Sequence, residues 1–164
     1  MVKRIVPLLP VAAFPFTIWL ALGMMGPEPP PVNPLLLIVL FWLLGLAGAV
    51  IVFLQAVRGK RQGRKLALAS MLVKLLHIQN YVVLFFVAML TFVFAALTIL
   101  VWIFDVMTIF LTGVVGLAAV VRCRMEGRLT TKAAIVNGIL QFVFCADVFS
   151  AIWVYRNSKE AFLS

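Results

Sequence analysis

Charged residues are scarce in this sequence. Of its 164 residues, 12% are charged and 65% are hydrophobic, whereas soluble domains average about 25% and about 45–50%. The mean hydropathy is +1.19. This composition excludes a soluble globular protein, and it excludes disorder, which requires low hydrophobicity. The two cysteines are too few for a disulfide scaffold. We therefore expect an all-α integral membrane helical bundle of one domain.

Sequence motifs of enzymes and metal sites are also missing. The chain has one histidine, so it lacks the residues of a His-rich metal centre. It contains no H-E-x-x-H, Walker, G-x-S-x-G or G-x-G-x-x-G motif. It has no C-x-x-C pair, which argues against a quinone-linked disulfide oxidase. The sequence therefore predicts no enzyme activity, no metal and no cofactor.

Five apolar segments are long enough for transmembrane helices, each of which takes about 20 residues. The expected spans are 5–25, 35–57, 69–93, 97–121 and 133–155. The first span contains three prolines and could instead be a signal peptide whose basic start is Lys3 and Arg4. No A-x-A site precedes Gly26, so we expect this segment to be retained as a span.

The boundary between the third and fourth spans is open to two interpretations, because no proline separates them. In the first, both spans are as given above, with a turn near Phe94 to Leu97. In the second, residues 66–79 lie on the inner surface and the spans run over 81–103 and 106–121. We favour the first, because a polar and small-residue stripe falls within about 80° of one continuous helical wheel. The stripe comprises Asp105, Thr108, Thr112, Gly116 and Ala119.

Basic residues occupy alternate connections between the spans. The first basic connection holds Arg58, Lys60, Arg61, Arg64 and Lys65. The second holds Arg122, Arg124, Arg128 and Lys132. Residues 26–34 contain no Lys or Arg. Because cytoplasmic loops carry the excess of Lys and Arg, we expect a cytoplasmic N-terminus and, with five spans, an outer C-terminus. Arg156 and Lys159 would then lie outside, against this rule.

The basic connections also suggest partners for the chain. We expect the lipid bilayer as the main partner, with anionic lipids at the five residues of the first basic connection, each contact worth about 1 kcal/mol. No fold capable of reading nucleic-acid bases is visible, so we expect no nucleic acid.

Two patterns concern packing and the membrane boundary. In the second span, small residues share one helical face, which allows close approach of another helix. They are Gly45, Gly48, Ala49, Val52 and Ala56. The tryptophans Trp19, Trp42, Trp102 and Trp153 all fall in the outer halves of the expected spans. This distribution predicts an outer aromatic belt.

Ionisable residues inside the expected spans are candidates for a functional site, because they are costly in a bilayer. Asp105 and Asp147 each lie eight residues from the outer end of a span, about 12 Å deep. Two carboxylates at one depth could share a proton or hold a cation. Alternatively, each caps a hydroxyl or amide of a neighbouring helix. Converging acids would favour transport, and acids facing separate neighbours would favour a structural role.

A second polar group lies nearer the cytoplasmic side. Ser70, Lys74, His77 and Tyr81 lie within about 60° on the third span. Lys74 could extend to the inner interface, and His77 could relay protons or bond a backbone carbonyl. Asn137 and Gln141 share a face of the fifth span and would reach this stripe if the two helices pack. Their default role is interhelical hydrogen bonding.

Four short motifs resemble a known family. They are KLLHIQNY at 74–81, MTIFLTGVVGLA at 107–118, QFVFCAD at 141–147 and YR at 155–156. Over residues 64–159 the chain resembles a family of small uncharacterised bacterial multi-pass membrane proteins. This resemblance implies a prokaryotic plasma membrane and no particular activity.

Three functions fit these observations. The first is a non-catalytic membrane protein that serves as an accessory subunit of a larger complex, because little mass lies outside the spans. The second is a small ion- or proton-coupled transporter that uses the intramembrane acids. The third is an intramembrane lipid-modifying enzyme with His77 as base, for which the sequence offers no obvious nucleophile.

Overall fold

The computed structural model describes residues 5–24, 26, 30, 32–90 and 95–159, and side-chain placement within α5 is described from residue 98 onward. These residues form an all-α structure. Its elements are a 3-10 turn, η1 (Val6–Leu8), and the helices α2 (Leu9–Gly23), α3 (Pro34–Val57), α4 (Gly63–Leu90), α5 (Ala95–Met125), α6 (Thr131–Leu140) and α7 (Ala146–Asn157). Four helical stretches are long and apolar enough to cross a membrane, namely Val6–Gly23, Pro34–Val57, Gly63–Leu90 and Thr98–Met125.

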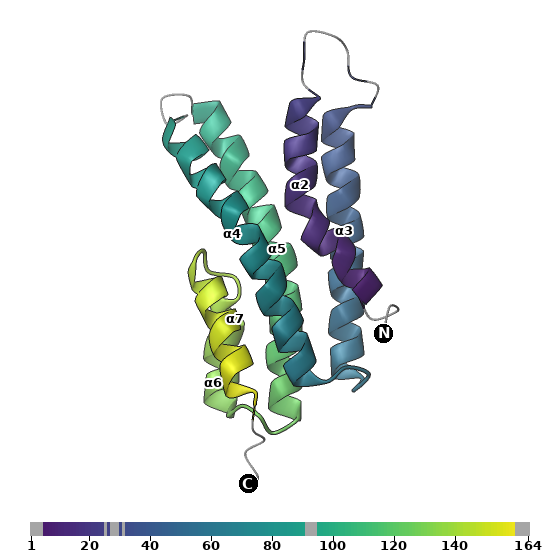
Figure 1. Ribbon diagram of the computed structural model, residues 1–164, viewed down its shortest axis with the longest axis vertical. Coiled ribbons are helices and arrows are strands. Elements are labelled where there is room, and N and C mark those ends of the chain that lie inside the picture. Colours follow the sequence, from purple (N-terminus) through teal and green to yellow (C-terminus); the bar gives the residue numbers. More distant parts are fainter. Residues whose placement is uncertain (1–4, 25, 27–29, 31, 91–94, 160–164) are drawn as a thin grey trace.

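The helices form two long antiparallel pairs, α2 with α3 and α4 with α5, and a short hairpin (Figure 1). Contacts between α3 and α5 join the two pairs. The hairpin of α6 and α7 packs against α5 and α4 along the lower half of Figure 1. We call the end that carries the α3–α4 and α5–α6 connections the basic end, and the opposite end the far end.

The expected span at 133–155 is not a single helix, and this prediction was wrong. The helix ends at Leu140, and a second helix begins at Ala146 and returns beside the first. The end of α7 lies at the basic end, where Arg128 Nη1 donates to the carbonyl of Ser158 at 2.9 Å. The described chain therefore ends at the same end of the molecule as its basic connections, and not opposite them as a fifth crossing would require.

The boundary between the third and fourth spans agrees with the first interpretation. Both α4 and α5 are continuous, and Asp105 lies inside α5 with Thr108 and Thr112 on its buried side. The turn expected near Phe94 to Leu97 falls partly on residues 91–94, which lie outside the described residues. The first apolar segment packs into the core, where Val11, Phe14 and Ile18 are all 0% exposed.

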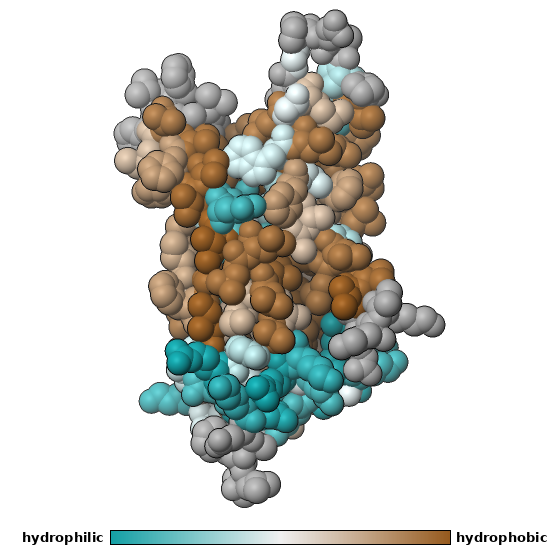
Figure 2. Space-filling model, viewed as in Figure 1, coloured by the Kyte–Doolittle hydropathy of each residue, from teal (hydrophilic) through white to brown (hydrophobic). Residues whose placement is uncertain are grey.

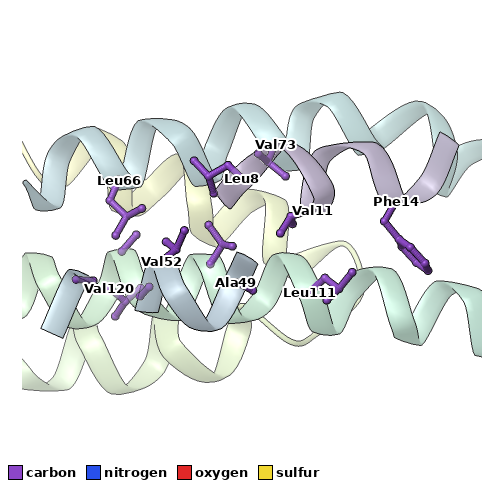
Figure 3. Close-up of a cluster of buried hydrophobic side chains, with 14 of the residues drawn as sticks. Leu8, Val11, Phe14, Ala49, Val52, Leu66, Val73, Leu111 and Val120 are labelled. Carbon is purple, nitrogen blue, oxygen red and sulfur yellow. The ribbon is translucent and has the colours of Figure 1, made fainter. Parts of the chain in front are cut away.

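The small-residue face of α3 is confirmed. Gly45, Gly48, Ala49, Val52 and Ala56 are all buried. A Cβ on Gly48 would overlap the carbonyl oxygen of Pro7, so glycine allows the backbone of η1 to rest directly on α3. The apolar core extends from this contact through α2, α4 and α5 (Figure 3). Labelled members include Leu8, Val11, Ala49, Val52, Leu111 and Val120.

Glu126 joins three elements at the basic end. Its Oε1 accepts from the backbone N–H of Gly63 and from Arg122 Nε, both at 2.9 Å, and its Oε2 accepts from Arg128 Nε at 2.9 Å. Burial opposes ionisation of Glu126, but these three donors outweigh it and lower the pKa of the carboxyl. Glu126 therefore ties the start of α4 to the end of α5, and through Arg128 to the end of α7.

The outer surface separates by polarity. Hydrophilic residues cover the basic end and apolar residues cover most of the rest of the visible face (Figure 2). Two tryptophans of the expected outer belt, Trp19 and Trp42, donate hydrogen bonds inside the protein, to Asn80 and to the carbonyl of Met107. The return of α7 also carries Trp153 toward the basic end. Trp102, in contrast, is 65% exposed.

Candidate functional site

The tip of the α6–α7 hairpin lies deep in the apolar part of the molecule. A helix of ten residues, such as α6, is about 15 Å long, roughly half of a hydrocarbon core of about 30 Å. The tip turns at Cys145, whose φ is 60°. Irregular backbone at membrane depth must be enclosed by protein, because lipid offers no hydrogen bonds. The contacts of α6 with α5 and of α7 with α4 enclose one side of the tip, where Gln141 is buried, whereas Phe142, Val143 and Phe144 are 38–44% exposed.

Two glycines of α5 make room for the tip. A Cβ on Gly113 would lie 2.6 Å from the Phe142 ring and 2.9 Å from the carbonyl oxygen of Gln141. A Cβ on Gly116 would overlap the side-chain Oε1 of Gln141. Both glycines fall within the MTIFLTGVVGLA motif. Their function in the fold is to let the hairpin tip approach the α5 backbone.

A buried ion pair anchors the hairpin tip to α4. Lys74 Nζ lies 2.8 Å from Asp147 Oδ2, and both side chains are 0% exposed. Lys74 Nζ also donates to the backbone carbonyl of Gln141 at 3.3 Å. The expected extension of Lys74 to the inner interface is therefore wrong. The cationic head stays at the middle of the molecule because an acid and a carbonyl both lie within its reach.

Hydrogen-bonded amides and a hydroxyl continue from the ion pair into the hairpin. Gln141 Nε2 donates to Ser150 Oγ at 2.8 Å, and Ser150 Oγ donates to Asn137 Oδ1 at 2.8 Å. Asn137 Nδ2 donates to the carbonyl of Ala133 at 2.9 Å, one turn nearer the basic end. Gln141 and Ser150 are thus brought together with Lys74 and Asp147 in one polar cluster.

Sequence reasoning missed Ser150. On a continuous helix, Gln141 and Ser150 would lie about 180° apart, and Gln141 and Asp147 about 120° apart. Only the turn at residues 141–145 places them on facing sides of a hairpin. The one local signal is that Asp147 and Ser150 are spaced by three residues, which puts them on one face of α7.

The same stripe of α4 also contacts α2. His77 Nε2 lies 3.1 Å from the carbonyl oxygen of Ala12. Since a carbonyl oxygen only accepts, Nε2 must carry the proton in this contact. Trp19 Nε1 donates to Asn80 Oδ1 at 2.8 Å, a contact that sequence reasoning also missed. The helical stripe thus faces α2 on one side and the hairpin on the other.

Several buried polar atoms around the pair have no hydrogen-bond partner among the described residues. They are Ser70 Oγ, His77 Nδ1, Gln141 Oε1 and the second carboxylate oxygen of Asp147, Oδ1. Buried polar groups normally have partners, so this concentration is unusual. The free acceptors lie on residues that already hold the ion pair or adjoin it. The arrangement can therefore accept additional protons or donors without breaking its existing hydrogen bonds.

The two acids face separate neighbours. Asp147 pairs with Lys74, whereas Asp105 lines a pocket of about 220 Å³ toward the far end. The other polar groups of this pocket belong to Tyr81, Thr98 and Trp102, and Phe144 of the hairpin tip also lines it. The Tyr81 ring packs edge-on against Phe144, with centroids 5.7 Å apart, between the pocket and the tip. Among the described residues, no cluster of three or more His, Cys, Asp or Glu side chains could hold a metal.

Comparisons with known proteins return nothing similar. No protein-family model matches the chain, and no curated protein and no solved structure matches it. The family resemblance therefore depends on the four sequence motifs alone. What the structure itself supports is an all-α protein with four apolar helices of membrane-spanning length.

Proposed function

We propose that the chain is a small multi-pass membrane protein that conducts protons, with Lys74 and Asp147 as the proton-exchanging pair. One observation carries this proposal: an acid and a base, both fully buried, lie 2.8 Å apart at the tip of a hairpin that reaches about half of the membrane depth. Intramembrane charges of this kind are rare and mark ion or proton pathways.

Stability alone does not explain why a protein would retain a buried ion pair. Moving two charges out of water costs several kcal/mol per ion, and apolar replacements of similar volume are often neutral or stabilising. The pair also lies beside irregular backbone, a combination that membrane proteins use around ion sites. A role in proton transfer explains why two charged side chains are retained at a buried position, where their desolvation costs free energy.

The neighbouring groups supply a route on either side of the pair. Transfer of one proton from Lys74 Nζ to Asp147 Oδ2 leaves a neutral amine and a carboxylic acid. Toward the basic end, the Gln141–Ser150–Asn137 chain follows the hairpin. Toward the far end, the pocket that contains Asp105 lies beyond Tyr81. His77 Nδ1 is a further acceptor on the same stripe.

Proton flux into liposomes tests the proposal. Protein reconstituted with an internal pH-sensitive dye should acidify the lumen under an imposed potassium diffusion potential, faster than protein-free liposomes. The double variant Lys74→Met/Asp147→Leu removes both charges without leaving one unpaired, so it should fold and fall to the protein-free rate. Lys132→Gln is the matched control, because it removes an exposed charge at the basic end that belongs neither to the pair nor to the route, and it should retain flux. Protein-free rates for the original chain, or full flux in the double variant, would refute the proposal.

A second candidate is an accessory subunit of a membrane complex. It is favoured by the separate surroundings of Asp105 and Asp147, because converging acids were the expectation for transport. Purification from native membranes in mild detergent tests it. A stoichiometric partner protein together with absent proton flux would favour this candidate over conduction.

The remaining features of the proposal concern location and chemistry. We place the basic end in the cytoplasm of a prokaryotic plasma membrane, supported by the gathering of Lys and Arg at that end. We propose no enzyme activity and no nucleic-acid partner. Against the lipid-modifying alternative, His77 is only 1% exposed and its Nε2 is engaged by Ala12, so it has no access to a lipid ester.

A further inference from the structure

An amphipathic pocket lies at the basic end, on the side of the molecule away from the hairpin. Its volume is about 590 Å³. Its walls are apolar and come from η1 and its flank and from the first turns of α4. The apolar lining residues are Ile5, Leu8, Leu66, Leu68, Ala69 and Leu72. The polar lining residues, Arg61, Gln62 and Lys65, all belong to the α3–α4 connection or the first turn of α4.

The charged groups of this pocket lie at one edge. Arg61 is only 7% exposed, and its Nε donates to Gln55 Oε1 at 2.7 Å, so the guanidinium is held in place. Lys65 is exposed, and among the described residues it forms no ion pair. The nearby acid, Glu126, is already engaged by Gly63, Arg122 and Arg128. Lys65 therefore offers positive charge to a ligand, at the edge of the pocket that Arg61 also lines.

The apolar part continues away from the charges. Leu72 lies nine residues after Gly63, about 14 Å along α4. Leu72 is 53% exposed, and apolar residues cover most of the visible surface above the basic end (Figure 2). A ligand that fits must combine an anionic head near Arg61 and Lys65 with a long apolar tail. In a bilayer, anionic phospholipids have that chemistry, and each basic residue near the surface contributes attraction to them.

We propose that this pocket binds one anionic phospholipid, with its phosphate between Arg61 and Lys65 and an acyl chain along Leu66, Ala69 and Leu72. The site is independent of the proposed proton conduction, because the pocket and the ion pair share no residue. It narrows the expected lipid contacts of the first basic connection from five residues to two.

Native mass spectrometry of the full chain in mild detergent tests the site. Phosphatidylglycerol should bind in preference to phosphatidylcholine of the same acyl chains. Arg61→Gln/Lys65→Gln should lower phosphatidylglycerol affinity roughly 30-fold, and Lys65→Gln alone about 5-fold. Ala69→Leu, which fills the pocket without changing charge, should also weaken binding. Lys132→Gln, in the other basic connection, is the matched control and should bind as the original chain does.

Each remaining outcome counts against the site. Equal binding of the two lipids would show that charge does not select the ligand. Unchanged affinity in Lys65→Gln, a surface variant expected to fold normally, would exclude the phosphate position. Unchanged affinity in Ala69→Leu would exclude the acyl position. Displacement of the lipid by millimolar inorganic phosphate would show that an anion alone suffices and would overturn the phospholipid assignment.

Discussion

At the scale of single residues, Lys74 and Asp147 depend on each other. Neither side chain has any exposure, and the pair is held at 2.8 Å. Removing one partner leaves an uncompensated charge in a low-dielectric interior, whereas removing both leaves none. The two substitutions should therefore be far from additive.

We expect Lys74→Met alone to lower the free energy of unfolding by about 3–5 kcal/mol, because Asp147 is then buried without its cation. The double variant Lys74→Met/Asp147→Leu should recover most of that loss. Thermal unfolding in detergent, followed by circular dichroism, measures both. Equal and additive losses would contradict the coupling.

Gly116 offers a second prediction at this scale. A Cβ at this position would overlap Gln141 Oε1, so Gly116→Ala should displace the Gln141 side chain and destabilise the protein by about 1–3 kcal/mol. Gly23→Ala is the matched control, because a Cβ there meets nothing within 4 Å. The same unfolding measurement applies. A loss in Gly23→Ala as large as that in Gly116→Ala would remove the support for a specific clash.

The polar stripe of α4 could be predicted from the sequence, but only some of the residues that contact it could. Helical spacing places Ser70, Lys74 and His77 on one face, and all three are buried. The residues that meet this face depend on a turn that no proline or glycine marks, because residues 141–145 read QFVFC. Wheel geometry on a continuous helix therefore separated Gln141 from Asp147.

At the scale of elements, the α6–α7 hairpin shows why hydropathy misleads. Residues 133–155 have the length and apolar character of one span, so composition alone predicts one helix. The hairpin forms instead because its polar groups find partners only when the chain reverses: Asp147 meets Lys74, and Ser150 meets Asn137. The face of α3 was predictable, in contrast, because its packing follows from helical spacing within one element.

The junction at Glu126 predicts a pH dependence. Its pKa is lowered in the folded protein, so this group adds stability that is fully present above its ordinary value of 4.5. That stability is lost as the pH falls through the lowered value. The melting temperature in detergent should therefore drop below about pH 4.5 as Gly63, Arg122 and Arg128 lose their acceptor.

Glu126→Gln separates this effect from other acid-induced changes. The variant should be less stable at neutral pH, because the amide is uncharged, and its melting temperature should fall less on acidification. A profile parallel to that of the original chain would exclude Glu126 as the cause.

At the scale of the whole molecule, the reversal at the hairpin changes which side each terminal segment occupies. Because the hairpin reverses the chain, α7 ends beside Arg128 at the basic end. Arg156 and Lys159, which a fifth crossing would place across the membrane from the other basic residues, join them at one end. Sequence patterns therefore misjudged the last expected span, whereas they correctly grouped the α3–α4 and α5–α6 connections at one end of the molecule.

Reporter fusions test this arrangement. A fluorescent reporter that folds only in the cytoplasm, fused after Ser164, should be bright, and an alkaline phosphatase fused at the same point should be inactive. The same pair of fusions at residue 93 should give the opposite result, because α4 ends at the far end. An active phosphatase after Ser164 would place the C-terminus across the membrane from the basic connections and would support a fifth crossing.

The return of α7 also bears on how the chain enters the membrane. If the basic end is cytoplasmic, as we propose, the connections that are carried across the membrane are α2–α3 and α4–α5, which together contain one ionisable residue, Glu28. In that topology the described residues after Met125 keep their basic side chains, Arg128, Lys132, Arg156 and Lys159, on the cytoplasmic side. The hairpin can therefore enter last and from the near side, as an insertion between helices that are already in place. The ion pair would then form at the final step, when Asp147 comes within reach of Lys74, which is already in place in α4.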